Sequence, residues 1–378
     1  MTDTVHRGLD GIVVTESALS KVDGEAGRLI YRGYPIEELA RECTYEEILY
    51  LLWYGDLPTH DERAALADDL AAARALDEGT ATLVAALAAA DEEPMAALRT
   101  AASRLSGTVD RPPGDSNNDE GAFNHGLAIT AKLPTILAAF DRERRGEAPV
   151  DPDPDLDHAT NFLYMLNGEK PDEVLAETFD AALVLHADHG INASTFSAMV
   201  TASTLADIYA ATTSAIGTLS GPLHGGANQD VMEMLLQIDD SDLDPDAWID
   251  EALEAGERIP GFGHRVYDVK DPRAYILGEM SESLGEAAGD LKWHRYCTTI
   301  EETMDDRLGL PPNVDFYSAT TYYQMDIPVD LYTPIFALSR VGGWVAHVLE
   351  QYEDNRIMRP RSRYVGETDR TVPPIDNR

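Results

Sequence analysis

Residues 194–221, STFSAMVTASTLADIYAATTSAIGTLSG, carry a single charged side chain, that of Asp207. The run predicts a long helix, and a helix that is apolar on nearly every side has no face suited to water. It is therefore expected in the core of a domain or in an interface between subunits. A buried helix of this length indicates a fold in which helices dominate.

Helical spacing recurs along the chain, with recognisable starts and stops. The clearest further helices are predicted over residues 61–79, 93–107, 171–190 and 331–354. Strand signals are few, and a hairpin between residues 11–17 and 27–34 is the best of them. The chain is therefore predicted to be mainly α-helical. Residues 106–121 and 146–157 are expected to be polar loops and residues 359–378 an extended tail, and no function is assigned to loop 106–121.

The charge of the chain excludes some partners. It has 378 residues and a net charge of −39, with 68 acidic against 29 basic side chains. Such a field repels nucleic acid and anionic lipid. A disordered acidic chain is the alternative, but 44% hydrophobic residues argue against it. The sequence thus predicts a folded protein suited to a salt-rich cytoplasm, where ions screen repulsion over a few ångströms.

Other sequence features agree with a cytoplasmic location. The N-terminus lacks a basic start followed by an apolar core, so no export signal is expected. No run of about 18 apolar residues occurs, so no membrane span is expected. Cys43 and Cys297 are the only cysteines, too few for a disulfide scaffold.

Two histidines lie on backbone that must bend sharply. His224 stands in GPLHGGANQD (221–230), and His264 stands in PGFGHRVYDVKDPRA (260–274). Glycine allows close approach of backbone N–H groups to a ligand, and histidine is suited to acid–base work near neutrality. The second stretch is not a dinucleotide fingerprint, because no strand leads into a G-x-G-x-x-G pattern. His347, in a helical pattern, is predicted to be a packed core histidine.

One carboxylate and several arginines complete the candidate chemistry. Asp315 lies among apolar neighbours in PPNVDFYSAT (311–320), where desolvation would make it a stronger base. The alternative is an aspartate that caps a helix or turn. Arg273, Arg340 and Arg359 stand among apolar or proline neighbours, and converging arginines suit a di- or tricarboxylate. Singly, each could be a surface or capping residue.

The HADH motif (186–189) raises the possibility of a metal site. The spacing of its two histidines places both on one face of a helix, and Asp188 adds a carboxylate. No H-E-x-x-H motif or cysteine cluster accompanies them, and no third ligand has the usual spacing. No metal site is therefore predicted.

Several of these motifs together resemble the citrate synthase family. GPLHGGAN, PGFGHRVY, DPRA, NVDFYSA and SRVGGWVAHVLE occur in the family's order and rough spacing, and GLDGIVVTES, IYRGYPIEELA and RPRS add to the similarity. The resemblance covers nearly the whole chain. It implies an all-α fold with a large helical domain (1–220 and 321–378), a smaller helical domain (221–320) and a minor N-terminal hairpin.

The resemblance also implies an activity: condensation of acetyl-CoA with oxaloacetate, followed by hydrolysis of citryl-CoA. Asp315 would be the base, His224 the donor to the thioester oxygen, and His264 the group that polarises the oxaloacetate carbonyl. Oxaloacetate would be held by His189, Arg273, Arg340 and Arg359.

In the family, the last arginine comes from the partner subunit, so a homodimer is expected. Arg265, Lys270 and Arg361 are our candidates for the CoA phosphates. No metal is implied, and CoA enters only as the acyl-CoA substrate. Three alternatives stay open: a 2-methylcitrate synthase using propionyl-CoA, a non-catalytic acidic helical binding protein, and, more distantly, a metal-dependent hydrolase built on HADH.

Overall fold

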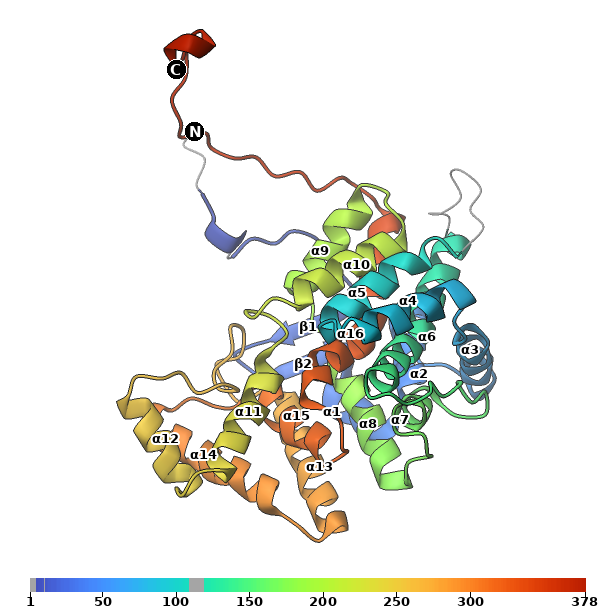
Figure 1. Cartoon of the computed structure of the whole chain (residues 1–378), viewed down its shortest axis with the longest axis vertical. Coiled ribbons are helices and arrows are strands. Elements are labelled where there is room, and N and C mark those ends of the chain that lie inside the picture. Colours follow the sequence, from blue (N-terminus) through green and yellow to red (C-terminus); the bar gives the residue numbers. More distant parts are fainter. Residues whose placement is uncertain (1–4, 10, 109–118) are drawn as a thin grey trace.

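The computed structural model describes residues 5–9, 11–108 and 119–378, and these residues form a helical protein (Figure 1). This confirms the predicted all-α class. Its α-helices are α1 (Ile36–Glu42), α2 (Tyr45–Tyr54), α3 (His60–Ala73), α4 (Glu78–Ala89), α5 (Pro94–Leu105), α6 (Asp119–Arg144), α7 (His158–Asn167), α8 (Glu173–His186), α9 (Ala193–Ser203), α10 (Ile208–Leu219), α11 (Ala227–Asp239), α12 (Pro245–Glu254), α13 (Pro272–Ala288), α14 (Lys292–Leu308), α15 (Val314–Tyr323) and α16 (Tyr332–Glu353).

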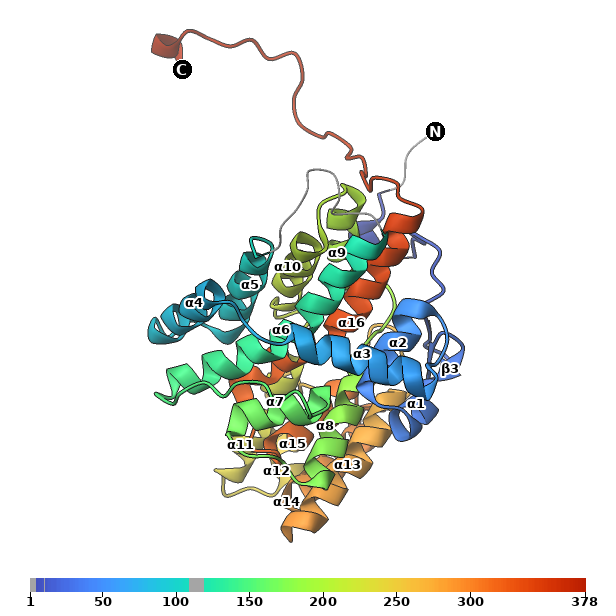
Figure 2. The ribbon, with the colours of Figure 1, turned by 90° about the vertical axis from the view of Figure 1, so that its right-hand side faces the viewer.

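The stretch 194–221, whose one charged residue is Asp207, buries one face of each of two helices instead of forming one helix. α9 ends at Ser203 and α10 begins at Ile208. The break has a local cause: Leu205 has a φ of +63°, and the Asp207 carboxylate accepts the N–H of Ala210 at 2.9 Å as an N-cap. The two helices pack against each other and against α5, α6 and α16 (Figure 2).

The predicted hairpin exists, but its first strand was placed wrongly. β1 (Ser20–Asp23) pairs antiparallel with β2 (Arg28–Tyr31), which pairs with β3 (Tyr34–Pro35). Residues 11–17 form no strand, and Val13 is 88% exposed.

Two predicted helix ends also move. The helix expected over 61–79 ends at Ala73, because the Asp77 carboxylate accepts the N–H groups of Gly79 and Thr80 and starts α4. The helix expected over 171–190 ends at His186, so the rest of HADH is a turn. The helices expected over 93–107 and 331–354 are confirmed as α5 and α16.

The turn after α8 is docked onto α16, which is buried along nearly its whole length. The Arg340 Nε donates to the carbonyl of His186 at 2.6 Å, and the Gly343 N–H donates to the carbonyl of Ala187 at 3.2 Å. A Cβ on Gly343 would lie 2.3 Å from that Ala187 oxygen, so only glycine allows this approach.

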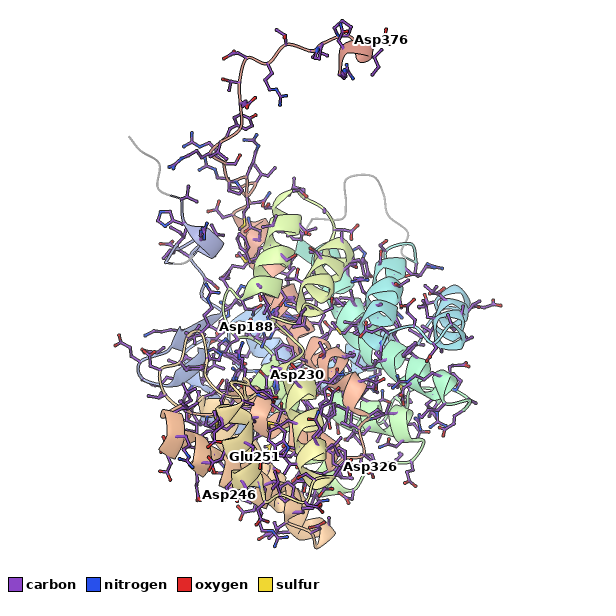
Figure 3. The ribbon with its side chains drawn as sticks, turned by 60° about the vertical axis from the view of Figure 1, so that its left-hand side comes forward. Asp188, Asp230, Asp246, Glu251, Asp326 and Asp376 are labelled. Atoms are coloured by element: carbon purple, nitrogen blue, oxygen red, sulfur yellow. The ribbon has the colours of Figure 1, made fainter. Side chains whose placement is uncertain are left out.

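A buried carboxylate holds the same turn. Asp188, inside the molecule in Figure 3, accepts from the Nε2 of His347 at 3.1 Å and from the N–H of Gly190 at 3.1 Å. Its main-chain carbonyl accepts from the Tyr31 hydroxyl at 2.7 Å. His347 is fully buried, which confirms its prediction as a core histidine.

Helices α11 to α15 pack against one another and lie at the lower left and lower centre of Figure 1. They reach the remaining helices through α13, which contacts α1 and α8, and through α11, which contacts α16. The proposed small domain (221–320) covers α11 to α14 and part of α15, which continues to Tyr323. The division into two domains stays a prediction.

The chain ends in an exposed segment that leaves the helical body (Figure 1) and carries one short 3₁₀ turn, Ile375–Asn377. This agrees with the predicted tail. Of the predicted loop 106–121, residues 109–118 lie outside the described residues. In the described part of the chain, no helix is both long and apolar enough to cross a membrane.

Gly343→Ala should test the docking of the turn on α16. The added methyl would overlap the carbonyl of Ala187, so we expect a loss of about 1–3 kcal/mol in the free energy of unfolding. Urea unfolding in molar KCl measures it. Gly278→Ala in α13 is the matched control, because its Cβ would meet only the Tyr317 ring, at 3.4 Å. Equal stability of the two variants would contradict the prediction.

Candidate active site

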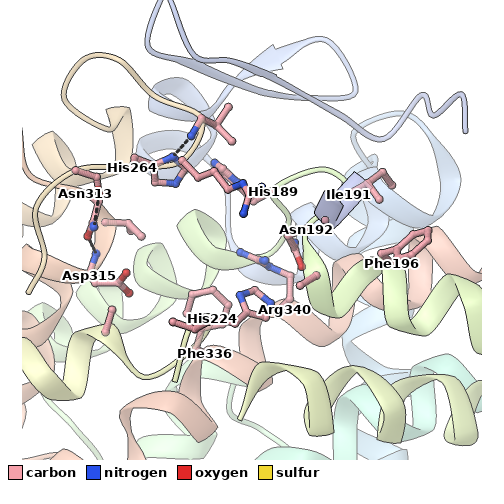
Figure 4. A pocket seen from close by; sticks show the side chains of 18 of the residues that line it. His189, Ile191, Asn192, Phe196, His224, His264, Asn313, Asp315, Phe336 and Arg340 are labelled. Carbon is pink, nitrogen blue, oxygen red and sulfur yellow. Dashed lines mark hydrogen bonds between the residues drawn. The ribbon is translucent and has the colours of Figure 1, made fainter. Parts of the chain in front are cut away.

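A cavity of about 1260 Å³ brings most of the predicted site residues together (Figure 4). Its walls come from the N-terminal segment, the turn after α8, the turn before α11, the loop before α13, and the starts of α15 and α16. The predicted residues on its walls are His189, His224, His264, Arg265, Arg273, Asp315 and Arg340.

His224 is presented as a neutral hydrogen-bond donor. Its own N–H donates to the carbonyl of Gly221 at 2.9 Å, which closes the turn. The ring Nε2 lies 2.8 Å from the Ser194 hydroxyl and 3.2 Å from the main-chain N of Ser194. Because a main-chain N–H can only donate, Nε2 is an acceptor and the proton of the neutral ring is on Nδ1. Burial, and secondarily the charge of Arg340, lowers the pKa of His224 to about 4. A Cβ on Gly225 would lie 2.4 Å from the Leu219 carbonyl, so this turn needs glycine.

His264 carries its proton on Nε2, whereas His224 carries it on Nδ1. Its Nδ1 accepts two main-chain N–H groups, from Val266 at 2.9 Å and Tyr267 at 3.1 Å. The proton of the neutral ring is therefore on Nε2. Burial, and then the nearby Arg273, lowers the pKa of His264 to about 4.

The glycines of PGFGH give the loop a shape that fits the start of α15. Gly261 and Gly263 have φ values of +82° and +74°. The Gly263 N–H donates to the carbonyl of Pro311 at 3.0 Å, and the Asn313 N–H donates to the carbonyl of Gly261 at 2.9 Å. The loop that carries His264 and the helix that carries the carboxylate are thereby joined.

Asp315 is the second residue of α15 and faces the cavity (Figure 4). The helix cap is Asn313, whose side-chain oxygen accepts the Asp315 N–H at 3.0 Å. The alternative that Asp315 itself caps a helix is therefore wrong. Burial raises the pKa of Asp315 from 3.8 to about 6, although the charge of Arg273 opposes the rise. The carboxylate is thus more basic than usual and still ionised at neutral pH.

The two buried arginines differ in their partners. Arg273 forms a bidentate pair with Asp271, with distances of 2.9 and 2.6 Å. Arg340 is 1% exposed, and no carboxylate oxygen lies within 4.0 Å of it in the described residues. Burial lowers the pKa of Arg340 to about 10, so it remains a cation. A buried cation with no carboxylate in contact favours an anionic ligand.

The two histidines of HADH have different surroundings. The His189 Nε2 lies 3.2 Å from the Tyr267 hydroxyl, and burial, with Arg273 and Arg340, holds the pKa of His189 well below 6.5. His186 is fully buried, and its Nδ1 donates to the carbonyl of Ala182 at 2.8 Å. Across the described ranges, no group of three His, Cys, Asp or Glu side chains could hold a metal ion.

The candidate CoA residues are separated. Arg265 is exposed at the cavity. Lys270 does not line it: the ammonium lies 2.5 Å from a Glu301 oxygen and 4.6 Å from the Tyr275 ring centroid. Arg359 and Arg361 are exposed on the C-terminal segment and do not line the cavity of their own chain.

The sequence reasoning missed several cavity residues. Arg258 lines it two positions before Pro260, where a basic residue beside PGFGH could have indicated it. Residues 11–15, expected in a strand, form part of the wall, and Leu223 is 98% exposed there. Ser194 and Tyr267, which bond to the histidines, carry no signal in the sequence.

Asp315→Asn should stabilise the folded protein. Because burial raises the pKa, ionising Asp315 costs folding free energy, fully above about pH 6 and not at all below about 3.8. We expect a gain of about 1–3 kcal/mol at pH 8 that shrinks as the pH falls from 6 toward 4. Urea unfolding at pH 8 and pH 5 measures it.

Asp246→Asn is the control, because Asp246 also occupies the second position of a helix, α12, but is exposed. It should lose a few tenths of a kcal/mol at most, through the helix dipole. The prediction fails if both variants change stability alike.

Comparison with known proteins places the whole chain in one family. The model for "Citrate synthase, C-terminal domain" matches residues 8–361. A citrate synthase of Haloferax volcanii is 62% identical over 100% of both chains. A 2-methylcitrate synthase of Corynebacterium glutamicum is 41% identical, also over 100% of both chains.

Solved structures agree. The citrate synthase of Pyrobaculum aerophilum has a TM-score of 0.89 at 40% identity, covering 99% of this chain and 95% of its own. A ternary complex of the citrate synthase from Thermoplasma acidophilum with carboxymethyl coenzyme A and oxaloacetate has a TM-score of 0.91 at 29% identity, covering 100% of both chains. The match in sequence, length and fold shows that this chain belongs to the citrate synthase family.

Proposed function

We propose that the chain is a citrate synthase, an acyltransferase that condenses acetyl-CoA with oxaloacetate and hydrolyses citryl-CoA to citrate and CoA. The observation that carries this is one cavity in which a basic carboxylate, Asp315, faces two neutral histidines and an unpaired buried arginine. Family membership supports the same reaction.

Asp315 and His224 carry out the first step in this proposal. The Asp315 carboxylate takes a proton from the methyl group of acetyl-CoA, and its raised pKa makes it a better base for that weak acid. The Nδ1–H of His224 donates to the thioester oxygen as negative charge develops there. A fixed donor needs no reorganisation during the reaction, which explains the rigid glycine turn.

Oxaloacetate occupies the arginine side of the cavity. Arg340, Arg273 and His189 bind its carboxylates, and the Nε2–H of His264 polarises its ketone carbonyl. The carbon nucleophile attacks that carbonyl, and water then hydrolyses the thioester of citryl-CoA. No cofactor is required besides CoA, which enters as part of the substrate.

CoA itself is an anion that must approach an acidic protein. Arg258 and Arg265 line the cavity and have no carboxylate within 4.0 Å in the described residues, so they are suited to its phosphates. Arg361 stays a candidate. Lys270 is a weaker one, because Glu301 already neutralises it.

We further propose a cytoplasmic homodimer in which Arg359 completes the partner's site. Arg359 belongs to the C-terminal segment, which leaves the helical body (Figure 1), and it does not line the cavity of its own chain. Closure of the small domain (221–320) over oxaloacetate would exclude water and complete the acetyl-CoA site. The acidic surface and the 62% identity to a halophilic archaeon's enzyme support a salt-rich cytoplasm.

A second candidate is a 2-methylcitrate synthase, because such a protein is 41% identical over the whole chain. The same residues would act on propionyl-CoA. Identity is higher to the citrate synthase of Haloferax volcanii, 62%, so acetyl-CoA is the preferred substrate in our proposal.

Thiol release in molar KCl tests the activity. With oxaloacetate present, we expect CoA release from acetyl-CoA at a higher kcat/KM than from propionyl-CoA. Faster turnover of propionyl-CoA would favour the second candidate. Absence of release from both substrates would refute the enzyme and favour a non-catalytic binding protein.

Asp315→Asn in the same assay should lower kcat by at least about 10³-fold, since the base is lost. Oxaloacetate binding, measured by calorimetry, should stay within about threefold, because the arginines and His189 remain. Loss of binding together with activity would assign Asp315 a structural role.

Mixing two inactive variants tests the role of Arg359. Dimers of Arg359→Ala lack the arginine in both sites, and dimers of Asp315→Asn lack the base in both. If Arg359 crosses to the partner, each mixed dimer has one intact site, so random reassortment should restore about a quarter of wild-type activity. If it acts within its own chain, every site keeps a defect and no activity returns.

A further inference from the structure

Tyr267 lies directly behind two of the histidines and does not line the cavity itself. It is 3% exposed. Its ring centroid lies 4.8 Å from that of His264 and 5.5 Å from that of His189. The ring centroids of His189 and His264 are 5.5 Å apart, with an angle of 70° between the ring planes. The three rings therefore form one aromatic cluster.

Two different parts of Tyr267 bond to the two rings. Its main-chain N–H donates to the Nδ1 of His264 at 3.1 Å. Its hydroxyl lies 3.2 Å from the Nε2 of His189. The second contact leaves open which atom donates, and the surroundings decide it.

The hydroxyl is the donor. Burial raises the pKa of Tyr267, so the phenol keeps its proton. His189 is neutral, because burial holds its pKa well below 6.5. Within the described residues, this contact is the only hydrogen bond of the buried hydroxyl, and an imidazole nitrogen is a better acceptor than a phenol oxygen. The proton of His189 is therefore on Nδ1, which has no partner among the described residues.

We propose that Tyr267 is a positioning residue that fixes the proton on both histidines, so that His264 presents Nε2–H and His189 presents Nδ1–H to oxaloacetate. Both rings are then donors to a ligand whose ketone and carboxylate oxygens only accept. The identity of this ligand rests on the proposed function, whereas the proton positions do not.

The loop that carries Tyr267 is held in place without the hydroxyl. The Asp268 N–H donates to the carbonyl of Gly24 at 3.2 Å, at the turn between β1 and β2. A Cβ on Gly24 would lie only 1.9 Å from the Val266 oxygen, so the loop and the turn are in close contact. Tyr267→Phe therefore removes one hydrogen bond and preserves the fold and the main-chain donor to His264.

Tyr267→Phe in the unliganded protein, labelled with ¹⁵N-histidine, tests the proton positions by NMR. In the wild type, we expect His189 to be protonated on Nδ1 and unprotonated on Nε2. We expect His264 to be protonated on Nε2 and unprotonated on Nδ1. The variant should mix the two forms at His189 and leave His264 unchanged. His189→Gln and His264→Gln assign the signals. A wild-type His189 protonated on Nε2, or a variant identical to the wild type, would overturn the proposal.

The kinetic readout separates positioning from a general structural effect. We expect the KM for oxaloacetate to rise roughly three- to tenfold in Tyr267→Phe, as for loss of one hydrogen bond, with the KM for acetyl-CoA within twofold. Tyr296→Phe, which loses a bond of 3.2 Å to Asp239 outside the cavity, should change neither. If Tyr267→Phe changes both KM values equally, or changes neither, the proposed role of Tyr267 in oxaloacetate binding is overturned. A wild type that releases no CoA would refute the proposed function and leave the NMR result standing.

Discussion

The site depends on the docking of the turn after α8 onto α16. Two consecutive main-chain carbonyls, of His186 and Ala187, accept from Arg340 and Gly343, and the carboxylate that follows them accepts from His347. These bonds set the position of His189 relative to Arg340, although about 150 residues separate the two in the sequence. They are satisfied inside the protein, where a missing partner would cost roughly 1–3 kcal/mol. These bonds therefore fix the turn after α8 against α16.

A second set of main-chain bonds joins the remaining groups. The loop before α13 and the segment before α15 exchange hydrogen bonds through Gly261, Gly263 and Asn313. These bonds therefore join His264 and Asp315 into one unit. Burial of this unit and of the docked turn has opposite effects on acids and bases: it raises the pKa of the aspartate and lowers that of the histidines. One physical cause thus produces a basic carboxylate and neutral imidazole donors in the same cavity.

The distribution of charge follows from the same geometry. The chain has a net charge of −39, yet cations line the cavity and Arg340 is buried there without a carboxylate. Several other arginines and lysines in the described residues pair with carboxylates, as Lys270 does with Glu301 and Lys292 with Asp239. The cations left unpaired at the cavity can attract anionic substrates that the rest of the surface repels.

The sequence alone determined much of this protein. The helical class followed from a nearly uncharged segment and from periodic ones, because helix formation and burial follow local spacing. The glycine-flanked histidines His224 and His264 and the apolar-flanked Asp315 were visible as candidates, because glycine marks backbone that can bend sharply or approach a ligand closely. The family followed from these motifs in order.

The tertiary structure decided what depends on contacts between distant segments. The chain breaks between α9 and α10 at Leu205, and the first strand is Ser20–Asp23 instead of residues 11–17. Lys270 forms an ion pair with Glu301 and does not line the cavity. The tertiary structure also decided which nitrogen carries the proton on His224, through Ser194, and on His189, through Tyr267. Proton positions, ion pairs and pKa values depend on which groups exclude water and which donors lie within about 3 Å, and those neighbours come from elsewhere in the chain.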